Sequence, residues 1–210
     1  MYEIELKAHV ADRKKTSCII DSFAEFSGTT FKTDFYYHLN TKDGNGVHGS
    51  KQIQLAEIPY ITCRLREEKT SLPDGTNETH NLFTYKTKER KTADDGTVYE
   101  CNIENETSLS NPDAVKKILL DSGYELSYTK TKYVRAWTYS TKFGNANLEL
   151  CTIELLGDFL EIEIVTESAG NEKQIYAELQ DLILKSGLSL SDIEPRYYSE
   201  LLREAKNTKQ

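Results

Sequence analysis

Residues 159–165 read Phe159-Leu160-Glu161-Ile162-Glu163-Ile164-Val165. Two glutamates alternate with strongly apolar residues, and this period of two is typical of a β-strand whose two faces differ. The stretch Tyr2–Val10 has the same pattern, with Glu3, Glu5 and Lys7 on one face. Both stretches therefore predict strands with one charged face and one apolar face.

Similar patterns predict six further strands. They cover Thr30–Asn40, Tyr60–Glu67, Asn81–Glu89, Thr97–Ser108, Glu125–Tyr139 and Asn147–Leu155. Several charged faces carry one sign: Arg64 with Arg66, Lys86 with Lys88, and Glu104 with Glu106. A surface made for solubility usually mixes the two signs.

For any one strand, a solvated outer face is the simpler interpretation. For the whole set, an eight-stranded closed antiparallel β-barrel accounts better for the charges. Apolar faces would pack outward against helices, and charged faces would line the lumen. A lipocalin-like lipid carrier is rejected, because its lumen would have to be apolar.

Helices are predicted between the strands. They run from Asp12 as N-cap to Gly28 as C-cap, from Ser110 to Gly123, over Glu172–Ser186, and after Pro195. The stripe Val115, Ile118 and Leu119 is expected to be the buried face of the second helix. Residues 40–57 are expected to form a long loop, and Asp94-Asp95-Gly96 a hairpin turn. One α+β domain over residues 1–210 is the economical interpretation.

Composition excludes several classes of protein. The chain has 210 residues, with 26 basic and 34 acidic side chains and a formal net charge of -8. This acidic balance argues against nucleic acid as a partner. No apolar run is long enough to span a membrane, and the first residues lack the pattern of a signal peptide, so a cytoplasmic location is expected. The four cysteines form no Cys-x-x-Cys pair, which argues against a zinc site.

Seven short motifs, in order along residues 2–202, resemble those of the CYTH superfamily, the triphosphate tunnel metalloenzymes. They are Glu3-Ile4-Glu5-Leu6-Lys7, Asp34-Phe35-Tyr36, Arg64-Leu65-Arg66, Thr84-Tyr85-Lys86, Glu104-Asn105-Glu106, Leu156-Gly157-Asp158-Phe159-Leu160-Glu161-Ile162-Glu163 and Arg196-Tyr197-Tyr198-Ser199-Glu200-Leu201-Leu202. The first motif alone is weak, because short runs of alternating charge recur by chance.

The resemblance implies a metal-dependent enzyme that binds a triphosphate in the barrel lumen. Metal ligands for Mg²⁺ or Mn²⁺ would be Glu3, Glu5, Glu161 and Glu163, with Glu104 and Glu106 as further candidates. Phosphate oxygens would be held by Lys7, Arg64, Arg66, Lys86, Lys88 and Arg135. Catalytic candidates are Lys7, Glu149 and Arg135. Arginine suits phosphate geometry, and carboxylates suit a hard cation, so the chemistry is consistent with the resemblance.

Three positions depart from the family pattern. Tyr133 precedes Arg135 where a basic pair is usual, Cys151 stands where an aspartate is frequent, and Asn102 stands where an arginine is frequent. Glu149, on the same face as Cys151, is a substitute for the missing aspartate. The departures leave the triphosphate cradle in place but leave the reaction open.

Three functions therefore remain. Conversion of ATP to cyclic AMP and pyrophosphate, as in class IV adenylyl cyclases, is preferred. Hydrolysis of tripolyphosphate, thiamine triphosphate or a nucleoside triphosphate is the alternative, and a triphosphate-binding module without turnover is the third. The resemblance also makes a homodimer plausible.

Overall fold

The computed structural model describes residues 2–39, 61–92, 96, 98–166 and 170–207. The side chains of residues 2, 39, 61, 62, 86–91 and 98–104 lie outside this description. The loop predicted at 40–57 and most of the hairpin turn at 94–96 also lie outside it.

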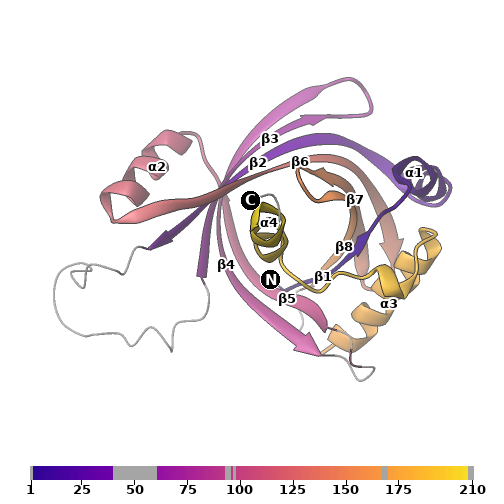
Figure 1. Ribbon diagram of the computed structural model, residues 1–210. Coiled ribbons are helices and arrows are strands. Elements are labelled where there is room, and N and C mark those ends of the chain that lie inside the picture. Colours follow the sequence, from indigo (N-terminus) through magenta and orange to yellow (C-terminus); the bar gives the residue numbers. More distant parts are fainter. Residues whose placement is uncertain (1, 40–60, 93–95, 97, 167–169, 208–210) are drawn as a thin grey trace.

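Eight strands and four α-helices make up the described part of the chain (Figure 1). The strands are β1 (Tyr2–His9), β2 (Glu25–Leu39), β3 (Ile61–Ser71), β4 (Asn77–Thr92), β5 (Val98–Ser108), β6 (Tyr124–Thr141), β7 (Gly144–Ile153) and β8 (Gly157–Thr166). The helices are α1 (Arg13–Asp21), α2 (Pro112–Asp121), α3 (Glu172–Lys185) and α4 (Tyr198–Asn207), and a 3-10 turn, η2, covers Leu190–Asp192. None of these helices has the length and apolar character needed to cross a bilayer.

All strand pairs are antiparallel, and the sheet is strongly curled. The pairing order is β1-β5-β4-β3-β2-β6-β7-β8, and β8 pairs in turn with β1. The β1–β5 contact is the shortest, with a register from Tyr2↔Ile103 to Glu5↔Glu100, whereas β1 and β8 pair from Tyr2↔Thr166 to His9↔Phe159. The predicted α+β class and eight antiparallel strands are confirmed.

The outer face of the sheet carries the hydrophobic core. Ile162 and Ile164 of β8 are fully buried there, in one cluster with Leu179 and Ile183 of α3. A second cluster joins Leu119 of α2 to the outer faces of β2 and β3. Figure 1 shows α1 and α3 together on one side of the curled sheet and α2 on the other. The prediction that apolar faces pack outward against helices holds for α1, α2 and α3, whereas Tyr198 and Leu201 of α4 pack against a smaller apolar cluster on the inner faces of β6, β7 and β8.

The predicted C-terminal end of the first helix is wrong. Asp12 caps α1 as expected, but the helix ends at Asp21, where the Ser22 amide donates to the Ile19 and Ile20 carbonyl oxygens. Gly28 is instead a residue of β2, at an irregularity in its pairing with β6. Its φ is +136°, and a Cβ there would lie 2.7 Å from the Ser71 carbonyl oxygen. Glycine is therefore needed for strand packing and not for ending a helix.

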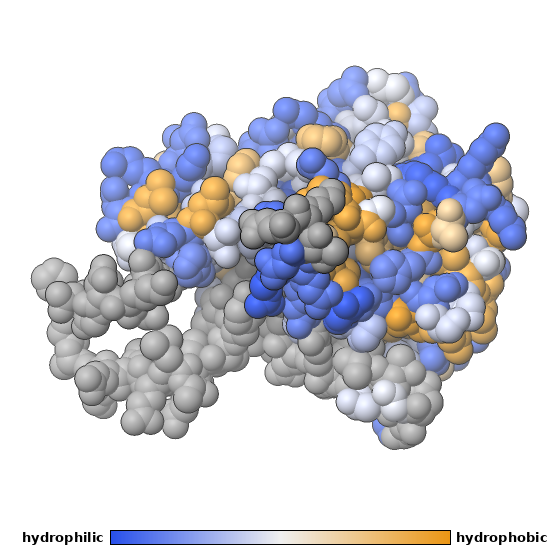
Figure 2. Space-filling view, in the orientation of Figure 1, coloured by the Kyte–Doolittle hydropathy of each residue, from blue (hydrophilic) through white to orange (hydrophobic). Residues whose placement is uncertain are grey.

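The second helix also differs from its prediction. Its N-cap is Asn111, whose side chain accepts a hydrogen bond from the Ala114 amide at 3.1 Å, and not Ser110. Figure 2 shows apolar surface over α2, and there Ile118 is 63% exposed although it was expected to be buried. The buried face of α2 is therefore narrower than its apolar residues suggest.

Candidate functional site

A polar cavity of about 280 Å³ lies inside the curled sheet. All eight strands and the start of α4 contribute to its lining. The lining residues are Glu3, Glu5, Lys7, Lys32, Tyr36, Arg64, Arg66, Glu68, Leu82, Thr84, Glu106, Tyr128, Lys130, Lys132, Glu149, Glu161, Glu163, Tyr197, Tyr198 and Ser199. The alternation of each strand brings these residues together, because their neighbours in sequence point outward into the core.

Asp34 of β2 organises one wall of this cavity. Its fully buried carboxylate accepts from Arg66 Nε at 2.5 Å and Nη2 at 3.1 Å. Lys130 Nζ lies 3.2 Å from the same carboxylate, and the Tyr36 hydroxyl donates to it at 3.2 Å. Burial alone would raise the pKa of Asp34, but Arg66 and Lys130 outweigh it and hold that pKa well below its usual value. One permanently charged aspartate thus fixes the guanidinium and ammonium groups of this wall.

Two ion pairs extend the wall towards β7 and β8. Lys32 Nζ lies 2.6 Å from Glu149 Oε1, and Lys132 Nζ lies 2.6 Å from Glu161 Oε1. Burial would lower the pKa of Lys132, but Glu161 raises it well above its usual value. Burial would likewise raise the pKa of Glu161, but Lys132 and Lys130 hold it far below the usual range. Both pairs are therefore charged across the physiological pH range.

Arg64 of β3 lines the cavity beside β4 and β5. Its Nη2 atom donates to Thr84 Oγ1 at 2.9 Å and to Glu106 Oε2 at 3.3 Å. The Thr84 hydroxyl also donates to Glu106, at 2.7 Å. The structure thus places Glu106, a candidate metal ligand, beside a guanidinium and a threonine.

Four further candidate metal ligands, Glu3, Glu5, Glu161 and Glu163, share the inner faces of β1 and β8. Glu5 lies directly opposite Glu163, and Lys7 directly opposite Glu161. Like charges directly opposite each other in a sheet destabilise it unless a cation offsets them. A set of carboxylate oxygens suits Mg²⁺ or Mn²⁺. The metal role of Glu3, Glu5, Glu161 and Glu163 stays a prediction, and Glu161 is held by Lys132 in the described state.

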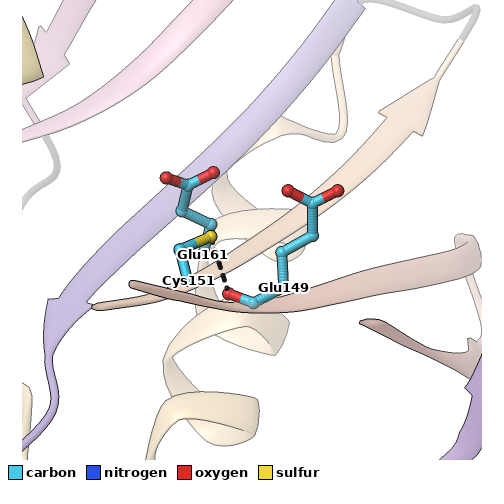
Figure 3. Close-up of side chains that lie close together, drawn as sticks. All are labelled: Glu149, Cys151 and Glu161. Atoms are coloured by element: carbon cyan, nitrogen blue, oxygen red, sulfur yellow. Dashed lines mark hydrogen bonds between the residues drawn. The ribbon is translucent and has the colours of Figure 1, made fainter. Parts of the chain in front are cut away.

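Cys151 does not fit as part of that set. Its sulfur, with a carboxylate oxygen of Glu149 and one of Glu161, forms a group of atoms within 4.8 Å of one another (Figure 3). The thiol, however, points to the Glu149 carbonyl oxygen at 3.5 Å and packs among Val134, Ile153 and Phe159. Burial, with Glu161 nearby, raises the pKa of Cys151 well above its usual value, so the thiolate that a metal would need is disfavoured.

The prediction that Arg135 lines the lumen is wrong. Its Nη2 atom donates to Asp21 of α1 at 3.1 Å, and its guanidinium stacks over Phe26 on the outer face. The inward basic pair of β6 is Lys130 and Lys132, two residues apart. The supposed departure at Tyr133 therefore disappears, because Tyr133 is an outward residue that is 51% exposed.

The other predicted residues divide into two groups. Lys7, Arg64, Arg66 and Glu149 line the cavity as expected. Lys86, Lys88 and Glu104 lie in β4 and β5, with their side chains outside the described part of the structure, as is that of Asn102. The sequence interpretation missed Lys32, Lys130, Lys132 and Tyr198. Trp137 was a usable signal for β6, because a buried tryptophan on the parity of Arg135 implies that this parity faces the core.

No family model and no curated protein matches the chain. Solved structures do match it over nearly their whole length. The PH1819 protein of Pyrococcus horikoshii OT3 is 22% identical, with a TM-score of 0.71, and the match covers 96% of this chain and 98% of that one. A proposed adenylate cyclase of Vibrio parahaemolyticus is 19% identical, with a TM-score of 0.68, and the match covers 97% and 98%.

A third solved structure is a proposed adenylyl cyclase from Hippeastrum, described as having a dominant triphosphatase activity. It is 14% identical, with a TM-score of 0.60, and the match covers 97% of this chain and 95% of that one. At such identities the matches establish the architecture alone. The chain shares the fold of these solved structures.

Proposed function

We propose that the curled sheet acts as a closed tunnel that binds a triphosphate together with a divalent cation, and that the chain is an enzyme acting on that triphosphate. One observation carries this proposal. Buried lysines of β6 and half-buried basic side chains of β2 and β3 line the same polar cavity as carboxylates of β1 and β8. Phosphate oxygens bind to fixed cationic groups, and a hard metal cation binds to carboxylates. This one cavity offers both kinds of group.

Binding of a triphosphate would replace some carboxylates of the ion pairs in the cavity with phosphate oxygens. Arg66, Lys32 and Lys132 are each held by a carboxylate, which keeps the cations charged and oriented before a ligand arrives. Phosphate oxygens would take over the donors of Lys32 and Lys132. They would also accept from Arg66 Nη1, which now donates to Glu68. A bound Mg²⁺ or Mn²⁺ would offset the charge of Glu5, Glu163 and the phosphate oxygens. Asp34 would keep Arg66 and Lys130 in place throughout, since it is fully buried.

Hydrolysis of the triphosphate chain is the reaction that the described cavity supports best. Leu82 is the single aliphatic side chain among the described lining residues, so most of the lining suits phosphate and not an organic group. Positioning and charge neutralisation supply most of the catalysis in phosphoryl transfer. The triphosphatase activity described for the Hippeastrum protein is consistent with this choice.

Cyclisation of ATP is the second candidate, supported by a different observation. Tyr36 and Tyr128 stack with ring centroids 4.4 Å apart and an interplanar angle of 11°, and both line the cavity. A flat aromatic pair at the cavity wall is a surface on which a nucleobase can stack. The name of the Vibrio protein is consistent with this candidate.

Product analysis separates the two reactions. The protein is incubated with tripolyphosphate and, separately, with ATP, each with Mg²⁺ or Mn²⁺, and orthophosphate, pyrophosphate and cyclic AMP are quantified. Orthophosphate from tripolyphosphate, lost in Glu163→Gln, is expected. Cyclic AMP from ATP without orthophosphate from tripolyphosphate would favour cyclisation. A melting temperature that rises with the ligand, without any product, would indicate a triphosphate-binding module without turnover. A melting temperature that does not rise would overturn the proposal.

A further inference from the structure

The segment that precedes α4 is hydrogen-bonded to β1 beside the cavity. Ile193 forms an isolated β-bridge with Ala8, and the Glu194 amide donates to the Lys7 carbonyl oxygen at 2.7 Å. Lys7 Nζ in turn donates to the Arg196 carbonyl oxygen at 2.6 Å. These contacts position the start of α4 at the lumen, and Figure 1 shows α4 within the ring of strands.

Tyr198, the first residue of α4, lies among the lysines of the cavity. Its ring is 9% exposed and packs edge-on against Phe159, with centroids 5.2 Å apart. The ammonium groups of Lys7, Lys130 and Lys132 lie 4.5, 5.0 and 5.2 Å from the ring centroid. The negative face of an aromatic ring attracts each cation, so the tyrosine adds to the attraction that Glu161 exerts on Lys132 and Asp34 on Lys130.

The hydroxyl of Tyr198 is the unusual part of this arrangement. It is buried and makes no hydrogen bond of standard geometry within the described residues, although the Glu161 carboxylate lies near enough to interact with it. A buried hydroxyl without a partner is costly, and native structures seldom keep one without a reason. A tyrosine hydroxyl carries its proton at neutral pH, so the group is an O–H donor.

The surroundings select the ligand for this donor. The three ammonium groups outnumber the two carboxylates, Glu161 and Asp34, that pair with them within the described residues, so the site favours an anion, and an O–H donor needs an acceptor oxygen. We propose that Tyr198 is a binding residue that donates its hydroxyl hydrogen to a phosphate oxygen held by Lys7, Lys130 and Lys132. This inference rests on the proposed function, and it makes the C-terminal helix part of the triphosphate site.

Tyr198→Phe tests the inference, with Tyr176→Phe as a matched control. Tyr176, on α3, is also buried, but its hydroxyl lies outside the cavity and accepts from Gln180 Nε2 at 3.1 Å. The probe is tripolyphosphate with Mg²⁺, measured by titration calorimetry, and melting curves of the free variants are recorded.

Tyr198→Phe should bind tripolyphosphate about tenfold more weakly or worse, because a hydrogen bond to a charged group is lost. Its melting temperature should equal or exceed that of the wild type, since an unpartnered buried hydroxyl is removed. Tyr176→Phe should melt lower by roughly 2–4 °C and bind tripolyphosphate as the wild type does.

Wild-type affinity in folded Tyr198→Phe would overturn the inference and leave the proposed function standing. An unfolded Tyr198→Phe would also overturn it, because the hydroxyl would then be needed by the fold and not by a ligand. Failure of the wild type to bind tripolyphosphate would instead overturn the proposed function.

Discussion

The two faces of β8 carry out different tasks with alternate residues of one strand. Leu160, Ile162 and Ile164 point outward and are fully buried against the helices. Glu161 and Glu163, between them in sequence, point into the cavity. The outer face therefore supplies hydrophobic stabilisation. The inner face carries charged side chains that serve ligand binding and add little to the stability of the free protein.

This contrast predicts which substitutions change the stability of the fold and which change ligand binding. Changes on the outer face should alter the free energy of unfolding and leave ligand affinity intact. Changes to the inner carboxylates should do the reverse. Asp34 is the exception, because it is an inner residue that the fold itself needs.

Asp34→Asn should produce the largest loss of stability, about 3–5 kcal/mol in the free energy of unfolding. The variant removes the charge that Arg66 and Lys130 share and leaves both cations buried. Urea unfolding measures the loss, and Asp181→Asn on the exposed face of α3 is the control with an unchanged midpoint. A loss below about 1 kcal/mol would show that Asp34 does not organise the wall.

Ile162→Ala should cost about 3 kcal/mol, because a fully buried side chain leaves a cavity between β8 and α3. The affinity for tripolyphosphate with Mg²⁺ should stay at the wild-type value at temperatures where the variant is folded. Calorimetric titration checks the affinity and urea unfolding the stability. A large change in affinity with little change in stability would reverse the roles assigned to the two faces.

Glu5→Gln should lower the rate of triphosphate turnover about 10²-fold, equivalent to about 2.7 kcal/mol, through loss of a metal-side charge. The free energy of unfolding should stay unchanged or rise, because Glu5 lies opposite Glu163 and one of two facing charges disappears. Turnover assays and unfolding curves of the same preparation give both values. Wild-type turnover in this variant would remove Glu5 from the site.

Acid should weaken the fold through Asp34 and Glu161, whose pKa values are held below the usual range by their cation partners. A group with a depressed folded pKa stabilises fully above its unfolded pKa of about 4, and this contribution is lost as the pH falls below that value. We expect constant stability from pH 7 to about 5, and a loss of about 1 kcal/mol per group by about pH 3. Unfolding curves at several pH values test this, and Asp34→Asn should show a smaller loss.

Alternation alone predicted the strands and the inner faces of β1, β3 and β8, because each has one apolar face that must be buried. It failed in β6, where both faces carry polar residues near Arg135 and the choice of face depends on Trp137 and α1. It also extended the first helix to Gly28, because a glycine in a strand and a helix-ending glycine look alike in sequence. Lys32 and Tyr198 were missed, since their partners Glu149, Lys7 and Lys130 are distant in sequence and come together only in the folded sheet.

A crystal structure with tripolyphosphate and Mn²⁺, with the metal located by its anomalous signal, tests the central claim most directly. The account predicts phosphate oxygens within hydrogen-bonding distance of Lys130, Lys132 and Arg66, and Mn²⁺ at Glu5 and Glu163. Tripolyphosphate bound outside the cavity, or Mn²⁺ bound elsewhere on the chain while the carboxylates of β1 and β8 hold none, would contradict it.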